Sequence, residues 1–517
     1  MKQLQTLSVV SPGFFGLNTQ ESGVTLSPNF SSVTDNVVID RYGRLGARKG
    51  WLMKTVDGTN DLGGDLISFL MEHVNADNTT VIISGGNNKL FKEGDSNNAL
   101  VDITPAGYTI TANNWKGASL YDHAMIAQEG HEPIIYTEAG TPVAKTMSDL
   151  TGVAQSYGTS FPRDVIAAYG RFWAHDGDSI YWSTDIADTA FPSFSGGTSG
   201  TLNISAIVPN NVDKITALAT HNGFLIIFCE RSIVIYQGAE NPLGNFALSD
   251  VIVGTGCIAR DSIQNTGNDL IFLSDLGIRS LGRLIQEKSL PMRDLTKNVR
   301  DDLLNDVILE KASAGHLHNV CSVYSEVNAF YLISLPTQSI VYCLDMRQAL
   351  EDGAARVTKW TKFKAAALLR KLNRDVLLGK VDGIGRYEGY SDNGASYKLK
   401  YLSHYMDMGA PTTLKILKQI RTTVIGGSGQ DFVVKTNFDY RDATSSYPFS
   451  IKQSNTAQYG VDEFGLCEYS VGIAIDSVRS SVGGSGNTIQ IGFEANVFQN
   501  PLSVQKIDMF VKTGRTS

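Results

Sequence analysis

The chain has 517 residues, of which 42% are hydrophobic and 19% are charged. This length exceeds what one hydrophobic core usually serves, so we expect one large repeat-built domain and a second, smaller one. The formal net charge of -8 argues against a protein that grips nucleic acid by neutralising its phosphates. The 50 Gly and 14 Pro residues favour many short strands joined by tight turns over a helical bundle.

Neither a leader segment nor a disulfide framework is predicted. The N-terminal residues lack the apolar core of a signal peptide, and no later run approaches the roughly 18 apolar residues that a membrane helix needs. The five cysteines are far apart and show neither Cys-x-x-Cys nor zinc-finger spacing: Cys229, Cys257, Cys321, Cys343 and Cys467. We therefore expect free, buried thiols and synthesis in a reducing cytoplasm.

A loose unit recurs seven times through residues 75–390, consisting of a strand, a tight turn and a second short apolar strand. In one copy the strand 170–174 leads through Asp176-Gly177-Asp178 to the strand 180–182. Successive copies lie roughly 44 to 59 residues apart, which is close to the four-strand period of propeller blades. The pattern predicts a β-propeller-like core over residues 75–394.

The longest interval between copies contains the one convincing helical pattern. Apolar residues recur at positions 295, 299, 303 and 307, which is the spacing of one helix face. We expect a helix at about 295–312 inserted between two blades. The simplest role for this helix is packing against the blades, and the alternative is a contact with a partner protein.

After residue 395 the pattern changes to longer strands with alternating polarity. These strands are predicted at 397–401, 418–424, 432–436, 469–473, 488–493 and 504–511. Strict alternation indicates one buried and one solvated face, as in a β-sandwich or platform sheet. We therefore predict an all-β protein in three parts: residues 1–74 form N-terminal strands and a hairpin that join platform and propeller, 75–394 form the propeller, and 395–517 form most of the platform.

Several chemical patterns are incomplete. The segment 251–259 has a strand followed by Gly-x-Gly-x-x-Ala, but a dinucleotide site also needs a helix directly after the glycines. His316 and His318 would share one face of a strand, yet no third metal ligand has a recognisable spacing. We expect no nucleotide site and no metal site.

Glycosidase chemistry is also not indicated. Four aspartates are close in sequence (Asp176, Asp178, Asp185 and Asp188), but acidic residues in turns usually cap those turns. The segment 392–397 is only a partial aspartate box. Nucleophile-elbow, Walker and His-Glu-x-x-His motifs are absent from the sequence. We expect no catalytic residue, no cofactor and no enzyme activity.

The N-terminal segment has a distinctive set of short motifs. They are Gly16-Leu17-Asn18, the pair Asp35-Asn36, and a hairpin that contains Gly43, Leu45, Arg48 and Gly50. This segment resembles the opening of the tail nozzle proteins of short-tailed bacteriophages, a family of tubular tail protein B-like and tail DNA-stabilisation proteins. The likeness continues at 272–278, 392–394 and 507–515, so it extends over nearly the whole chain.

The resemblance implies a structural virion protein without enzyme activity. It implies a homohexameric ring below the head-to-tail adaptor ring, with a DNA channel and gate for genome retention and ejection. Tail fibres or tail tip proteins are further partners, and viral DNA passes the lumen without sequence-specific binding. The protein would be assembled in the host cytoplasm and located in the virion tail. The matching residues would serve the fold: Gly43 in a tight turn, Gly50 through backbone freedom, and Arg48 through pairing.

Two alternatives remain open from the sequence. The first is a carbohydrate- or receptor-binding propeller, such as a tail adhesin or a degraded glycosidase, with aromatic and acidic residues in a pocket at a blade mouth. The second is a cellular interaction scaffold. The net charge of -8 also motivates the hypothesis that a ring lumen would be acidic and would repel DNA.

Overall fold

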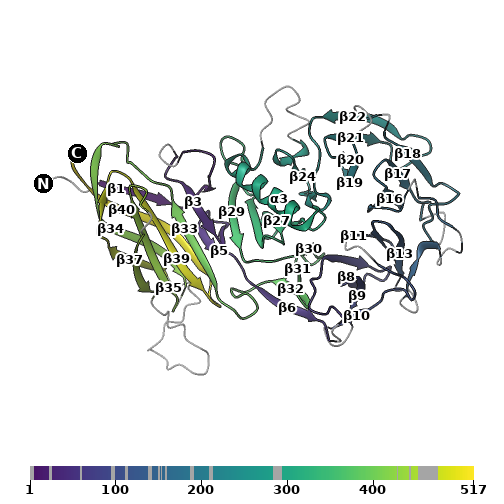
Figure 1. Ribbon diagram of the computed structural model, residues 1–517, viewed down its shortest axis with the longest axis horizontal. Helices are drawn as coiled ribbons and strands as arrows, with labels where there is room; N and C mark the ends of the chain where they lie inside the picture. The colour runs from purple at the N-terminus through teal and green to yellow at the C-terminus, as the bar shows by residue number, and fades with distance from the viewer. Residues whose placement is uncertain are drawn as a thin grey trace.

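The computed structural model places a ring of β-sheets beside a two-layered β-platform (Figure 1). It describes residues 5–22, 26–58, 61–94, 99–110, 114–137, 143–148, 152, 154–157, 160–186, 191–205, 207–208, 213–282, 294–427, 429–441, 444–451 and 475–516. Both chain ends lie on the platform side, at the pole farthest from the ring. The predicted all-β fold with a propeller-like core and a platform is confirmed.

Six blades of four antiparallel strands make up most of the ring, each running from the axis outwards. The first four are β7 to β10 (Phe69–Val74, Thr80–Gly86, Lys89–Glu93, Leu100–Asp102), β11 to β14 (Trp115–Leu120, His123–Gln128, His131–Thr137, Val143–Thr146), β15 to β18 (Asp164–Ala168, Arg171–His175, Ser179–Trp182, Gly200–Asn203) and β19 to β22 (Ile215–His221, Phe224–Cys229, Ser232–Gln237, Ala247–Val253).

The other two blades are β26 to β29 (Cys321–Ser325, Phe330–Leu335, Ile340–Asp345, Arg356–Thr361) and β30 to β32 (Ala367–Arg370, Val376–Lys380, Gly383–Tyr387) with β6 (Trp51–Val56) as the outer strand. The N-terminal β6 thus closes the ring by completing the last blade. The first blade begins at Phe69, slightly before the expected boundary at residue 75.

A smaller sheet fills the position between the fourth and fifth of these blades. It has three strands, β23 (Gln264–Asn265), β24 (Leu270–Ser274) and β25 (Gly277–Ser280), preceded by the 3-10 helix η2 (Arg260–Ser262). Helix η2 contacts both β19 and β26, so it stands where the innermost strand of a full blade would stand.

Continuous apolar runs explain the blades. Strand β20 reads Phe-Leu-Ile-Ile-Phe-Cys, and all its residues except Phe224 are buried. Such a strand has neighbouring sheets on both faces, so both faces must be apolar. Its odd and even side chains accordingly enter two different core clusters, one shared with the preceding blade and one with the small sheet.

The predicted helix is present but begins later than expected. It is α3 (Arg300–Ala314), after a short 3-10 turn η3 (Lys297–Val299). Position 295 is not helical, because the Leu295 N–H donates to the Ile278 backbone oxygen (3.0 Å) and the Leu295 backbone oxygen accepts the Ala355 N–H (2.9 Å). Leu303 and Val307 are buried, and Gly315 ends the helix in the left-handed conformation.

The platform is a sandwich of two sheets around one core. One sheet has the order β37 (Ile475–Ser481), β34 (Thr413–Gly426), β40 (Leu502–Thr516), β5 (Leu45–Ala47) and β4 (Val37–Ile39), with β1 (Gln5–Val10) on β40 and β38 (Ser485–Gly486) on β34. The facing sheet has β3 (Phe30–Asp35), β33 (Tyr397–Ser403), β39 (Ile489–Val497), β35 (Asp431–Phe438) and β36 (Ser445–Ser450), with β2 (Gly16–Leu17) on β3. The predicted strand at 469–473 lies outside the described residues.

Propeller and platform share one sheet. Strand β29 pairs with β3 in parallel at Lys359 and Asp35, so the fifth blade continues into the platform as a ten-stranded sheet. Backbone hydrogen bonds therefore cross the boundary between the two parts, which indicates a stiff connection.

The described cysteines are Cys229, Cys257, Cys321 and Cys343, and all four are free and buried, as expected. Cys467 lies outside the described residues. Within the described part of the chain, no helix is long and apolar enough to cross a membrane.

Candidate functional site

A cavity of about 540 Å³ lies at one mouth of the propeller axis. Two kinds of turn line it. The turns that lead into the innermost strands contribute Asn114, Arg163 and Lys214. The turns that join the second and third strands of a blade contribute Glu129 and Arg231. Residues at and beyond the end of α3 complete the wall, namely Lys311, His316 and His318. The cavity is therefore built by parts of the chain that are far apart in sequence.

Two buried polar side chains in the cavity wall have unused hydrogen-bonding capacity. His175 is 1% exposed, and neither of its ring nitrogens has a hydrogen-bond partner among the described residues. The closest carboxylate oxygen, Asp164 Oδ2, lies 4.0 Å from His175 Nε2. Burial lowers the pKa of His175 to about 4, so the ring is neutral at pH 7. Asn114 donates to Glu129 (3.2 Å), but its Oδ1 accepts no hydrogen bond from the described residues.

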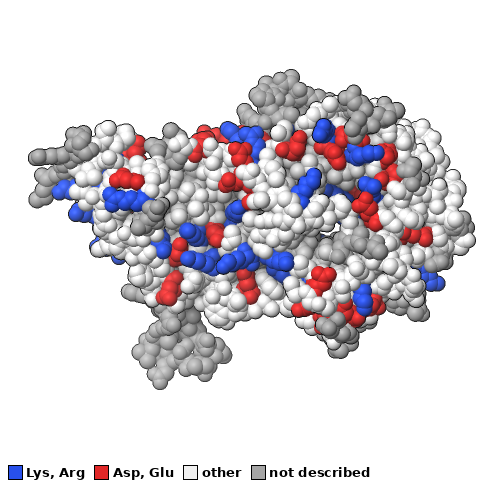
Figure 2. Space-filling view, in the orientation of Figure 1, with Lys and Arg blue, Asp and Glu red and all other residues white. Residues whose placement is uncertain are grey.

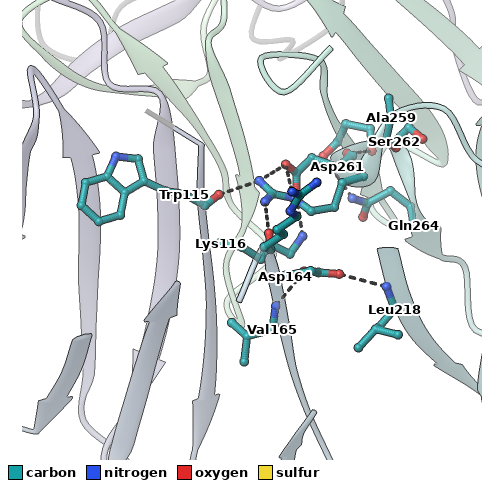
Figure 3. A network of polar contacts seen from close by, with 12 residues as sticks. Trp115, Lys116, Asp164, Val165, Leu218, Ala259, Asp261, Ser262 and Gln264 are labelled. Atoms are coloured by element: carbon teal, nitrogen blue, oxygen red, sulfur yellow. Dashed lines mark hydrogen bonds and ion pairs between the residues drawn. The ribbon is translucent and has the colours of Figure 1, made fainter. Parts of the chain in front are cut away.

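A charged network connects helix η2 to strand β11 (Figure 3), and its member Arg260 also lines this cavity. Arg260 donates to the backbone oxygens of Arg163 and Trp115, at 2.7 Å each, and pairs with Asp261 at 2.7 Å. Lys116 reaches Asp261 from β11, with Nζ 2.6 Å from Oδ1. Burial alone would raise the pKa of Asp261, but Arg260 and Lys116 lower it to about 2.

This network joins elements from different sides of the ring. The Ser322 hydroxyl, on β26, donates to the Asp261 backbone oxygen (2.8 Å). Lys116 and Asp261 also line a second axial cavity of about 190 Å³. The ion pairs of Arg260, Asp261 and Lys116 therefore lie between the two cavities and occupy the axis there.

A second carboxylate fixes two adjacent blades. Asp164 accepts a hydrogen bond from the Leu218 N–H, at 2.9 Å, which connects β15 to β19 (Figure 3). Its other oxygen accepts the Val165 N–H at 2.8 Å. Both carboxylate oxygens are thus used to hold backbone, which is a structural role.

The motif residues singled out in the N-terminal segment lie elsewhere, mostly where propeller and platform meet. Arg48 is fully buried and makes two hydrogen bonds to Asp392, at 2.8 and 2.7 Å. Its Nε donates to the Asn36 side-chain oxygen at 2.8 Å. The guanidinium lies between the rings of Phe363 and Tyr397, at 4.5 and 4.0 Å from their centroids.

Four more motif residues support the same junction. Gly50 packs so closely on Ser391 that an added Cβ would lie 1.9 Å from its backbone oxygen. The Asp35 carboxylate accepts the backbone N–H and the hydroxyl group of Thr361. Gly16 has a φ of +86° and faces the Val357 backbone. The nearby Leu17 is buried in the core beside α3.

The remaining motif residues are not at the junction contacts. Asn18 accepts the backbone N–H groups of Gln20 and Glu21 and thereby shapes the turn after β2. Gly43 has a φ of +70° in the β4–β5 turn, and Leu45 is buried in the platform core. These contacts are structural in character.

The sequence motifs that could carry chemistry do not come together into a catalytic centre in the part of the chain that the structure describes. The glycine segment after β22 leads into η2, which has only three residues, so the helix of a dinucleotide site is missing. His316 and His318 were expected on a strand, but they follow the end of α3 in an irregular segment, because Gly315 stops the helix there. Their rings stack at 4.9 Å, and no group of three metal-ligating side chains occurs in the described part of the chain.

The aspartate cluster is held in turns. Asp176 accepts the N–H groups of Asp178 and Ser179, while Asp185 pairs with Arg171 at 3.3 Å. Asp188 lies outside the described residues. The Arg260 network was not anticipated, and the only sequence signal for it is a charged pair, Arg260-Asp261, directly after the glycine segment 254–259.

Comparison with known proteins gives no family assignment. No protein-family model and no curated protein matches the chain. Among solved structures, YCF48 bound to a D1 peptide is 11% identical, with 66% of this chain and 97% of that chain covered and a TM-score of 0.38. The WD40 β-propeller domain of Doa1 is 9% identical, with 65% and 96% covered and a TM-score of 0.36. At these values the likeness assigns no function, and the propeller is defined by its own sheets.

Proposed function

We propose that this chain is a structural subunit of a short-tailed phage nozzle, in which the platform takes part in a ring and the propeller is carried as a fixed accessory body. The observation that carries the proposal is the junction between the two parts. Three of the residues on which the family resemblance rests lie there: Arg48 donates to Asn36 and to Asp392, and Gly50 packs on Ser391.

The junction suits an assembly component because it suppresses hinge motion. The shared sheet from β29 through β3 to β33 provides backbone continuity. The fully buried Arg48 pairs across the boundary with geometry that only a planar guanidinium provides. A ring subunit that holds its propeller at one angle needs such a stiff connection.

The plugged propeller axis also supports this view. Arg260, Asp261 and Lys116 occupy the axis, so a DNA channel would have to be formed between subunits and not through the propeller. In this proposal six copies surround the channel below the head-to-tail adaptor ring, and tail fibres or tip proteins bind outside. The protein has no enzyme activity and is located in the virion tail.

The charge on the surface is uneven. Figure 2 shows Lys and Arg side chains gathered in a band across the middle of one face, although the chain as a whole is acidic. For an acidic lumen, this face would have to lie away from the channel. A map of the assembled ring with this band facing DNA would refute the acidic-lumen part of the proposal.

Oligomeric state tests the proposal. Size-exclusion chromatography with light scattering, in the presence of the cognate adaptor ring, should give a particle with six copies of this chain. A chain that stays monomeric and ignores adaptor rings would overturn it.

A second candidate is a receptor- or carbohydrate-binding propeller, and the axial cavity favours it. The cavity has the size of a small-molecule site and lies at a mouth of the ring, where a ligand could enter. A monomer that binds a defined glycan through this cavity would favour the second candidate over the nozzle.

A further inference from the structure

The axial cavity differs in charge from the rest of the chain. Its lining has five Lys or Arg residues (Arg163, Lys214, Arg231, Arg260 and Lys311) and three Asp or Glu residues (Glu129, Glu230 and Asp275). The whole chain, in contrast, has a formal charge of -8. Cations gathered in a concave site raise the local concentration of anions.

Two of these cations are available to a ligand. Arg163 pairs with Glu129, Lys214 with Asp178, and Arg260 with Asp261. Arg231 and Lys311 are exposed and form no ion pair with any described residue. They come from different elements, the β20–β21 turn and the last turn of α3, yet both line this cavity.

The buried part of the wall also offers unused polar groups. Both ring nitrogens of His175 and the Asn114 side-chain oxygen lack hydrogen-bond partners among the described residues, although both residues are more than nine-tenths buried. Such groups are costly to leave unpaired, and a polar ligand would satisfy them. A neutral imidazole can donate from one nitrogen and accept at the other.

The lining contains no Phe, Tyr or Trp side chain, so it lacks the flat apolar surface on which a neutral sugar ring would stack. We propose that the axial cavity binds a small anionic molecule through a carboxylate or phosphate group, with Arg231 and Lys311 as the charge-recognising residues and His175 as a buried hydrogen-bond partner. The inference goes beyond the nozzle role, because it concerns one subunit and does not depend on ring formation.

Isothermal titration calorimetry on the full chain tests this inference with four probes: inorganic phosphate, succinate, glucuronate and glucose. We expect saturable binding of at least one anion and none of glucose. Binding of phosphate alone, or of the carboxylates alone, identifies the group that the cavity recognises. An absence of binding for all three anions at millimolar concentration would overturn the proposal.

Variants locate the binding. The double variant Arg231→Gln, Lys311→Gln should weaken binding by about tenfold to a hundredfold, because it removes two charged partners. Lys418→Gln is the matched control, since Lys418 is exposed on β34, far from the cavity lining, and it should bind like the parent. Equal binding by the parent and the double variant would also contradict the proposal.

His175→Gln tests the buried end of the cavity and should also weaken binding. Near-ultraviolet circular dichroism shows whether this variant is folded. If it is not folded, the binding measured for the variant Arg231→Gln, Lys311→Gln, whose two side chains are exposed, decides whether the cavity binds anions. The variant Arg231→Gln, Lys311→Gln should still assemble into rings with the adaptor. Loss of anion binding therefore tests the cavity, whereas loss of ring assembly tests the nozzle proposal, and the two failures are distinguishable.

Discussion

Arg48 and Asp392, 344 positions apart in the chain, form a two-pronged ion pair in which the arginine side chain is fully buried. Breaking a buried pair on one side leaves an uncompensated charge, which typically costs about 3–5 kcal/mol. We expect Asp392→Ala to lower the free energy of unfolding by about 3 kcal/mol, measured by urea denaturation.

The control for this prediction is Arg370→Gln. Arg370 pairs with Glu326 at the surface, where both side chains are at least 40% exposed, so its loss should cost below about 1 kcal/mol. Equal effects of the two substitutions would show that the junction pair contributes nothing beyond a surface ion pair.

Gly50 should not tolerate a side chain. A Cβ at this position would lie 1.9 Å from the Ser391 backbone oxygen, and backbone on both sides would have to move. Gly50→Ala should therefore destabilise the protein by about 3 kcal/mol or more, at or above the upper end of the range that is typical of overpacked cores. Gly483→Ala is the matched control, because a Cβ there has nothing within 4 Å. Thermal unfolding of the two variants gives the comparison, and a normal midpoint for Gly50→Ala would be inconsistent with the packing at the junction.

Lys380 should make stability depend on pH in the alkaline range. Burial lowers its pKa to about 7, with Asp392 opposing and Arg48 reinforcing that shift. The folded state therefore binds fewer protons than the unfolded state between about pH 7 and 10.5, so the free energy of unfolding rises as pH increases through this window. Lys380→Met should flatten the rise. Urea denaturation midpoints at pH 7 and pH 9 measure this rise in stability. An equal rise in the parent and in the variant would rule out Lys380 as its cause.

His175 should make the protein sensitive to acid. Its folded-state pKa is about 4 against an ordinary value of 6.5, because the ring is buried. The unfolded state takes up a proton first, so the free energy of unfolding falls as pH decreases from about 6.5 to 4. His175→Gln should reduce this fall, although His73, whose pKa is also lowered to about 4, keeps part of it. Denaturation curves of parent and variant at pH 7 and pH 5 test this. If the variant loses as much stability as the parent between these pH values, His175 is not a source of the acid sensitivity.

The blades and platform strands could be predicted because their signal is local. A run such as 224–229 is apolar throughout, because an inner blade strand is buried on both faces. The alternation after residue 395 is local in the same way. The predicted start of α3 is wrong because the apolar residue at 295, although periodic with 299 and 303, uses its backbone N–H and carbonyl oxygen in hydrogen bonds to Ile278 and Ala355 outside the helix.

The candidate site could not be predicted, since its parts meet only after the ring closes. Lys116 and Asp261 are 145 positions apart and come from opposite arcs of the ring. His175 is the last residue of β16 and Arg231 lies in the turn after β20, and no spacing in the sequence indicates that they line one cavity. The junction residues were noticed through the family resemblance, but only the structure pairs Arg48 with Asp392.

The measurement that tests the central proposal most directly is electron microscopy of the full chain incubated with its cognate head-to-tail adaptor ring. The account predicts closed rings of six subunits, with the platforms forming the ring and the propellers held at one fixed angle around a central channel. Single, unassembled particles, or rings in which the propellers take variable angles to the platforms, would contradict it.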